Sequence, residues 1–194
     1  MQKTKGKSLA LAALVITTAF GAAGCSTTAK TIDSSTELAR AAAATDTTVV
    51  IGKFQMFRNG EAVKLGEGIF ANRATLQLVR DGEDRKIVGM VGRGGEFAWA
   101  LEPGDYVISR IGFMNRGEKF EPKANLAFTV TADSEAIYVG TITLESTFES
   151  GYYGLNGTVD SYAIDDDCAA DCAERLARLG LDSGSMVVDL FQPE

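Results

Sequence analysis

The sequence predicts a mostly β protein: an antiparallel β-sandwich with a short C-terminal helix. From Thr47 onward, short runs rich in Val, Ile, Phe and Thr alternate with turns made of Gly, Asn and Asp. No long helical pattern separates these runs, which favours seven or eight strands joined mostly by tight turns. One helical pattern, near residues 166–179, follows these strands.

The first 24 residues have the composition of a signal peptide. Lys3, Lys5 and Lys7 give a positive start, residues 9–20 form an apolar stretch, and residues 21–24 are all small. These are the three parts of a secretory signal. The apolar stretch is shorter than the roughly 20 residues that a spanning helix needs, so a permanent transmembrane anchor is the weaker interpretation.

The end of this segment, Ala22-Ala23-Gly24-Cys25, resembles the lipobox of bacterial lipoproteins. In that family the cysteine is acylated and becomes the mature N-terminus, so the resemblance implies lipidation of Cys25 and a membrane anchor. Ser26 stands where an inner-membrane retention signal usually shows Asp, which implies the outer membrane. Cleavage after Ala23, leaving a free soluble protein, is the alternative.

Residues 25–46 are rich in Ser, Thr and Ala and contain few bulky apolar side chains. This composition predicts a flexible tether between the anchor and the folded part. Ser34 and Glu37 have capping-box spacing, which indicates a possible short helix near 35–44. The folded domain is then expected to occupy residues 47–194.

Within the domain, alternation of apolar and polar residues predicts which side chains face the core. The expected inward groups are Val50, Phe54 and Met56; Phe97, Trp99 and Leu101; and Leu126, Phe128 and Val130. Glu96, Ala98 and Ala100 are expected to face outward. Asn59-Gly60, "DGED", "GRGG" and "EPGD" supply the turns.

The end of the chain changes character. Asp165, Asp166 and Asp167 precede "CAADCAERLARLG", a helical pattern that Asp165 would cap and that Gly180 would end. "SMVVDLF" is expected to form a final strand.

The segment "FAWALEPGDYVIS" resembles the signature of transthyretin-like and carboxypeptidase-regulatory-like sandwiches. The downstream "AIYVGTITL" is similar to a strand often seen in bacterial lipoproteins with such domains, many of them of unknown function. The resemblance covers roughly residues 74–145 and implies a sandwich of the transthyretin or immunoglobulin-like kind. It implies no active site.

Composition excludes several classes of function. The chain contains no histidine, which removes the Ser-His-Asp and Cys-His arrangements and the usual catalytic zinc sites. No phosphate-binding loop precedes a Lys-Ser/Thr pair. The net charge is −7, and removing the three lysines of the signal segment brings it to −10. Such a surface repels nucleic-acid phosphates, so nucleic acid is not an expected partner.

Three groups of residues remain as candidate sites. Asp165, Asp166 and Asp167 could contribute to a calcium site, although a role at the helix start is the simpler interpretation. Cys168 and Cys172 suggest a disulfide in an oxidising compartment, but i,i+4 helical spacing is wide for one, and both states stay open. Tyr152 and Tyr153, between glycines, could present aromatic faces to a sugar or protein.

These observations favour an envelope lipoprotein that acts by binding, without a cofactor and without catalysis. The expected partner is another envelope protein, bound through a sheet edge or a loop cluster. A glycan- or peptidoglycan-binding module is the first alternative. A carboxylate-based hydrolase, which would need two acids converging in a cleft, is the second.

Overall fold

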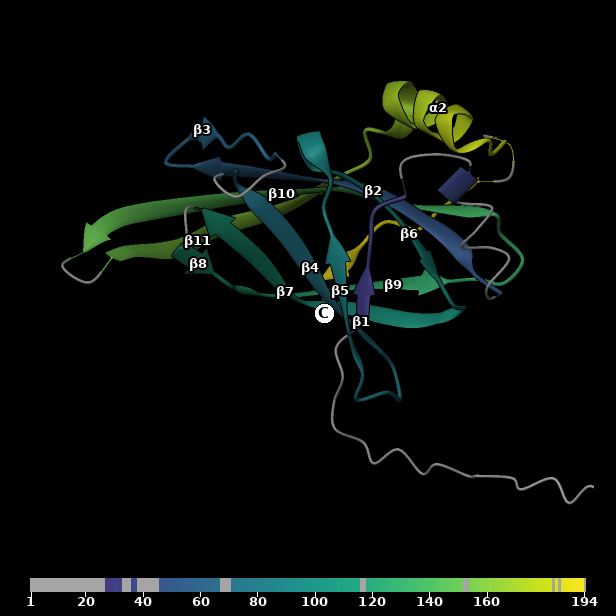
Figure 1. The fold of residues 1–194 in the computed structure, drawn as a ribbon, viewed down its shortest axis with the longest axis horizontal. Coiled ribbons are helices and arrows are strands. Elements are labelled where there is room, and N and C mark those ends of the chain that lie inside the picture. The colour runs from purple at the N-terminus through teal and green to yellow at the C-terminus, as the bar shows by residue number, and fades with distance from the viewer. Residues whose placement is uncertain are drawn as a thin grey trace, which may run out of the picture.

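The computed structural model describes residues 27–32, 36–37, 46–66, 71–115, 118–151, 154–182, 184 and 186–193. It confirms the mostly β fold, in which two sheets pack face to face and one helix lies outside them (Figure 1). The predicted signal peptide and Cys25 lie outside these residues. Residues 36–37 are helical, and the rest of the possible helix near 35–44 also lies outside them.

The first sheet is ordered β1-β5-β4-β7-β9-β13, with β8 paired to β7. Its strands are β1 (Thr27–Ala29), β4 (Arg73–Arg80), β5 (Lys86–Met90), β7 (Gly104–Asn115), β8 (Glu118–Phe120), β9 (Lys123–Val130) and β13 (Gln192–Pro193). All its pairs are antiparallel except β1–β5, which is parallel.

The second sheet is ordered β11-β10-β2-β3, with β6 paired to β2 and β12 paired to β10. Its strands are β2 (Thr48–Arg58), β3 (Glu61–Ala62), β6 (Glu96–Leu101), β10 (Ala136–Gly151), β11 (Gly154–Asp165) and β12 (Met186–Val188). The pairs β10–β2 and β10–β12 are parallel. The sandwich is therefore built from mixed sheets rather than from purely antiparallel ones.

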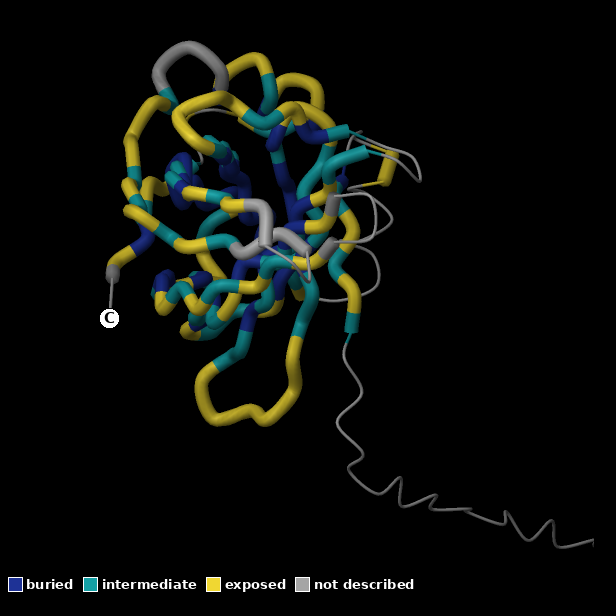
Figure 2. The backbone as a smooth tube through the Cα atoms, turned by 90° about the vertical axis from the view of Figure 1, so that its left-hand side faces the viewer, coloured by how far each residue is buried: buried dark blue, intermediate teal, exposed yellow. Residues whose placement is uncertain are grey.

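The three groups of side chains predicted to face inward are all buried between the sheets (Figure 2). Phe97 and Trp99 stack with their ring centroids 4.1 Å apart. The indole nitrogen of Trp99 donates a hydrogen bond to the carbonyl of Met90 in the opposite sheet, at 2.9 Å. Burying an aromatic ring is strongly stabilising, and this bond satisfies its polar atom.

A second apolar layer lies on the outer face of the second sheet. Helix α2 (Cys168–Leu179) covers this face, and its Leu176 and Leu179 are buried against Ile51, Ala98 and Tyr138. Ala98 points away from the main core, as alternation predicts. It is nevertheless fully buried, because α2 covers this outer face of the sheet.

The boundaries of α2 differ from the prediction at its start. Asp165 is the last residue of β11 and not the cap, and the helix begins at Cys168 after Asp167. Its end is as predicted: Gly180 adopts the left-handed conformation at φ 75° and donates its N–H to the carbonyls of the last turn.

The segment predicted as a tether differs most. Thr27–Ala29 form β1, which pairs with β5. Thr31 then bonds to the carbonyl of Met90 through its hydroxyl, and the N–H of Ile32 bonds to the carbonyl of Ala98 in the other sheet. Residues 27–32 therefore cross from one sheet to the other. Ala29 packs on the main core and Ile32 under the helix, so apolar contacts hold a stretch that looks polar in sequence.

The C-terminal residues make a similar crossing on the opposite edge. The N–H groups of Asp189 and Phe191 donate to the carbonyls of Tyr138 and Val139 in β10, and β13 then pairs with β9. Phe191 is buried and packs edge-on against Phe128, with ring centroids 5.3 Å apart. Of the predicted final strand, "SMVVDLF", only Met186–Val188 form a strand, β12 in the second sheet, and β13 in the first sheet follows just beyond it.

Two of the predicted turns are crossings between sheets and not hairpins. The "GRGG" segment forms a short 3-10 turn, η1 (Arg93–Gly95), that leads from β5 in the first sheet to β6 in the second. The "EPGD" segment then leads from β6 back to β7. Tyr106 stabilises this return, because its hydroxyl donates to the carbonyl of Glu102 at 2.8 Å.

Gly94 and Gly95 offer a matched test of this first crossing. Both have positive φ, at 79° and 91°, but only Gly95 lies where an added Cβ would come within 2.1 Å of a backbone atom, the carbonyl oxygen of Phe54. Gly94→Ala is expected to lose about 1–2 kcal/mol of unfolding free energy from backbone strain. Gly95→Ala is expected to lose roughly 1–3 kcal/mol more, because β2 must shift. Urea denaturation measures both, and equal losses would contradict the close approach.

Candidate functional site

The largest cleft of the described residues lies where one edge of β2 is left uncovered. β6 pairs with β2 from Thr48 to Lys53, and β3 pairs with Phe57 and Arg58. Between these two partners a groove of about 1020 Å³ opens along β2. Its walls are η1 on one side and the chain after β3 on the other, where the N–H of Val63 bonds to the carbonyl of Met56.

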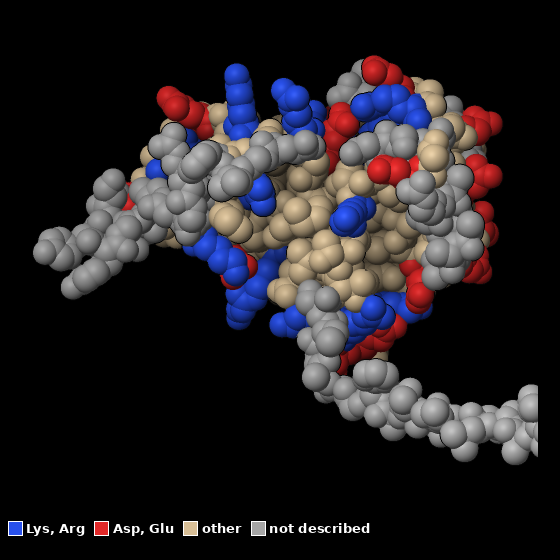
Figure 3. Space-filling model, viewed as in Figure 1, with Lys and Arg blue, Asp and Glu red and all other residues tan. Residues whose placement is uncertain are grey.

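The charge of this groove is opposite to that of the chain as a whole. Lys53, Lys64 and Arg93 line it, and no carboxylate is found among its described lining residues. Lys64 and Arg93 are exposed, and neither forms an ion pair with another described residue. We call this cleft the basic groove. Figure 3 shows basic and acidic side chains over most of this view, with a row of acidic ones along its right edge.

The basic groove also has apolar and neutral polar walls. Phe57, Ala62 and Ala71 contribute apolar surface, and the neutral polar residue Gln55 also lines the groove. The side chain of Asn72 is held in place, because its amide donates to the carbonyl of Lys64 at 3.0 Å. Apolar walls with a few fixed polar groups and exposed cations such as Lys64 and Arg93 suit a ligand that combines apolar surface with negative charge.

A second groove, of about 800 Å³, lies on the outer face of the first sheet and is acidic. Its described lining includes five carboxylates: Asp81, Glu83, Asp84, Asp105 and Asp189. Thr129 donates two hydrogen bonds to these acids, both at 2.8 Å: its hydroxyl donates to Asp105, and its backbone N–H donates to Asp189. Converging carboxylates, which the hydrolase hypothesis requires, therefore exist, but these two join β7 and the C-terminal crossing to β9.

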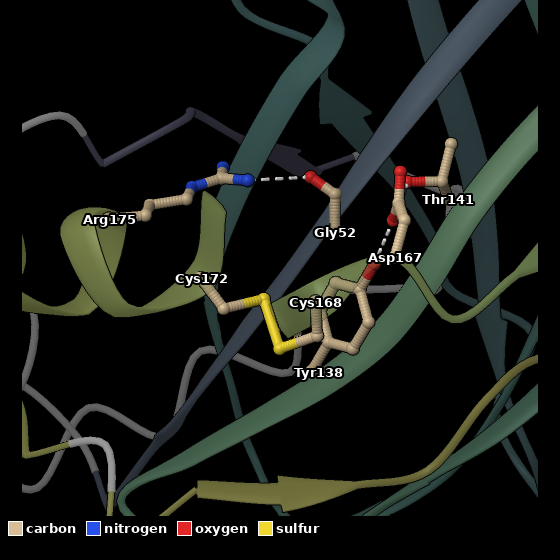
Figure 4. The surroundings of a disulfide bond; sticks show 7 residues. All are labelled: Gly52, Tyr138, Thr141, Asp167, Cys168, Cys172 and Arg175. Atoms are coloured by element: carbon tan, nitrogen blue, oxygen red, sulfur yellow. Dashed lines mark hydrogen bonds between the residues drawn. A yellow bond between two sulfur atoms is a disulfide. The ribbon is translucent and has the colours of Figure 1, made fainter. Parts of the chain in front are cut away.

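The start of α2 holds a polar cluster, drawn in Figure 4. The carboxylate of Asp167 accepts hydrogen bonds from the hydroxyls of Tyr138 at 2.6 Å and Thr141 at 2.7 Å. About two turns further along the helix, Arg175 donates to the carbonyl of Gly52 at 2.8 Å. These bonds attach both ends of the helix's first two turns to the sheet beneath.

Ionisation of this cluster is shifted in both directions. Burial, and then the hydrogen bond to Asp167, raise the pKa of Tyr138 to about 12. Burial of Asp167 acts to raise its pKa, but the hydrogen bonds from Tyr138 and Thr141 outweigh that effect and lower the pKa below its ordinary value. The cluster is therefore stable as a neutral phenol donating to a carboxylate.

The sequence left the state of Cys168 and Cys172 open, and the structure joins them in a disulfide with Cα atoms 5.0 Å apart. Asp165, Asp166 and Asp167 are exposed, and Asp167 is engaged with Tyr138 and Thr141. No group of three or more His, Cys, Asp or Glu side chains that could hold a metal ion is found in the described part of the chain. Tyr152 and Tyr153 lie outside the described residues.

The basic groove was not anticipated from the sequence. Its cations, Lys53, Lys64 and Arg93, lie on three different segments that are separated by charged and neutral residues. Their spacing along the chain gives no sign of a shared site, because they meet only where the folded chain leaves a cleft between β3 and β6.

Comparison of the chain with models of known families, with curated proteins and with solved structures finds no match. Within the described ranges, no helix is both long and apolar enough to span a bilayer.

The shifted pKa of Tyr138 leads to a prediction about alkaline stability. The folded state holds the phenolic proton more tightly than the unfolded state, whose pKa is about 10. The contribution is therefore complete below pH 10 and is lost as the pH rises toward 12. Tyr138→Phe is expected to unfold with about 1 kcal/mol less free energy at pH 7, and this difference should narrow above pH 10.

Denaturation of the two proteins at a series of pH values measures the difference. Asp167→Asn serves as the acid-side control, because the lowered pKa of Asp167 gives a contribution that is present at neutral pH and lost below about pH 4. A difference between wild type and Tyr138→Phe that stays constant up to pH 12 would contradict the role given to this hydrogen bond.

Proposed function

We propose that this protein is a lipid-anchored binding module of the bacterial cell envelope. Cys25 carries the anchor, the outer membrane is its location, and the sandwich binds another envelope protein without catalysing a reaction. The signal-like segment and the lipobox-like residues 22–25 support the anchor. More than one acyl chain on such a cysteine is enough for stable membrane attachment.

The basic groove is the observation that carries the binding role. It is a large cleft beside an uncovered stretch of sheet edge, lined by three cations in a chain that is strongly acidic overall. Two of these cations, Lys64 and Arg93, are exposed and form no ion pair with another described residue. Next to apolar walls they favour a partner segment that carries both carboxylates and apolar side chains. The partner is accordingly a protein segment with acidic and apolar residues, laid along β2 between β3 and β6.

Binding is preferred to hydrolysis because of how the acids are used. The carboxylates of Asp105 and Asp189 both accept hydrogen bonds from Thr129, which connects β9 to β7 and to the C-terminal crossing. Groups engaged in this way serve the fold. The basic groove, in contrast, presents Lys64 and Arg93 without ion pairs among the described residues.

Site-specific photocrosslinking in intact cells tests this proposal. A photoreactive residue at Gln55, inside the groove, is expected to capture one envelope protein, whereas the same residue at Thr158, exposed on β11, is the matched control. The captured protein is then purified, and its affinity for the wild type and for variants is measured by titration.

The double variant Lys64→Glu and Arg93→Glu is expected to bind about tenfold more weakly, because two exposed ion pairs of roughly 0.7 kcal/mol each are lost. The double variant Lys86→Glu and Lys123→Glu, two exposed changes on β5 and β9, alters the net charge by the same amount and is the control. Equal affinity of the double variant and the control, or capture only from position 158, would overturn the assignment of the groove.

A further inference from the structure

The distance between the proposed anchor and the fold is very short. β1 begins at Thr27, two residues after Cys25. Because an extended residue spans at most about 3.6 Å, the Cα atom of Thr27 lies within about 7 Å of that of Cys25. The headgroup layer on each side of a bilayer is of similar depth, roughly 5–8 Å. An acylated Cys25 therefore places the first strand of the sandwich at the membrane surface.

β1 is also fixed to the rest of the domain. It pairs in register with β5, from Thr27 opposite Ile87 to Ala29 opposite Gly89. The guanidinium of Arg85 donates to the hydroxyl of Thr27 at 2.7 Å, at the first residue of the strand. Because β1 is held in this way, it cannot rotate freely relative to the rest of the domain. The position of the anchor therefore also determines which end of the domain faces the bilayer.

That end is the loop between β4 and β5, residues 81–85, which we call the hairpin tip. The tip is exposed along its whole length and, in both views, extends further from the body than the start of β1, on the same side (Figures 1 and 2). It is held in shape by backbone bonds from Asp81 to Asp105 and from Glu83 to Arg80. At its base, Arg80 forms ion pairs with Glu83 at 2.9 Å and Glu102 at 3.0 Å.

From this geometry we infer that the hairpin tip rests against the headgroups of the bilayer and holds the sandwich in one orientation on it. The inference rests on the proposed anchoring through Cys25. β3 and α2 lie on the opposite side of the sandwich from the tip (Figure 1). The basic groove, which runs beside β3, is then presented away from the membrane to its partner.

The charge of the tip indicates which lipid surface it fits. Asp81, Glu83 and Asp84 outnumber the cation within the tip, Arg85. An anionic leaflet repels such a surface, so zwitterionic headgroups are its partner and the acyl chains supply the attachment. Contact is maintained by the shortness of the link and not by charge attraction.

The chain's own cysteines make a direct test practicable. With Cys25 acylated and Cys168 bonded to Cys172, an introduced cysteine is the accessible free thiol. The acylated full chain is placed in vesicles of phosphatidylcholine and phosphatidylethanolamine. An environment-sensitive fluorophore is attached to Asp84→Cys in the tip or to Glu61→Cys in β3, both exposed acidic positions. Lipids with a spin-labelled headgroup are then added as the quencher.

Quenching is expected to be several times stronger at position 84 than at position 61. Inserting a flexible Gly/Ser spacer of about 20 residues after Ser26, with an average span of about 25 Å, is expected to abolish this difference while the protein still floats with the vesicles. Equal quenching at the two positions on the unmodified link, in protein that floats, overturns the orientation alone.

Labelling and flotation of the wild type distinguish a failure of the proposed anchor from a failure of the proposed orientation. It is expected to take up no fluorophore and to float with the vesicles, whereas Cys25→Ser is expected to stay in solution. A wild type that is labelled at Cys25 and does not float overturns the proposed anchor, and the orientation with it.

Discussion

The structure depends on the stacked pair of Phe97 and Trp99, which joins the two sheets through one short strand. Their rings fill the core, and the indole of Trp99 bonds to Met90 in the opposite sheet. Glycines make room for the rings: a Cβ at Gly52 would lie 2.4 Å from Phe97, and one at Gly89 would lie 2.6 Å from Trp99. β6 is thereby fixed against β5 in the opposite sheet, and β5 pairs with β1. The core is therefore connected to the proposed anchor through β6, β5 and β1.

The short length of β6 also creates the basic groove. Because β6 covers β2 only as far as Lys53, and β3 begins its pairing at Phe57, the edge between them is not covered by a strand. η1 turns the chain between sheets just before β6, with Gly95 close to the carbonyl of Phe54. β3 starts at the Asn59-Gly60 turn, at the far end of the hairpin, and ends at Ala62 opposite Phe57. The binding surface that we propose follows from where these two strands stop.

The second sheet needs cover on both faces, and this explains the helix. Val50 and Phe54 face the core, whereas Ile51, Ala98 and Tyr138 on the other face would expose apolar surface to water. α2 covers that face, and the bond from Tyr138 to Asp167 fixes its start. Charge is distributed over the same sandwich, with carboxylates around the hairpin tip and the acidic groove, and cations in the basic groove.

The sequence by itself determined the local features of this protein. Alternation placed Phe97, Trp99 and Leu101 in the core, Asn59-Gly60 and Gly180 ended their elements because their positive φ suits those residues, and the absence of histidine excluded whole classes of catalysis. Tertiary structure alone decided the rest. Residues 27–32 look like part of a polar tether, but Thr27–Ala29 form a strand, because β5 offers them an edge and the core accepts Ala29. The "GRGG" and "EPGD" turns cross between sheets, and Lys53, Lys64 and Arg93 meet at one cleft. Which strands pair with each other is decided by packing between residues far apart in the sequence, and such packing produces no periodic pattern in the sequence.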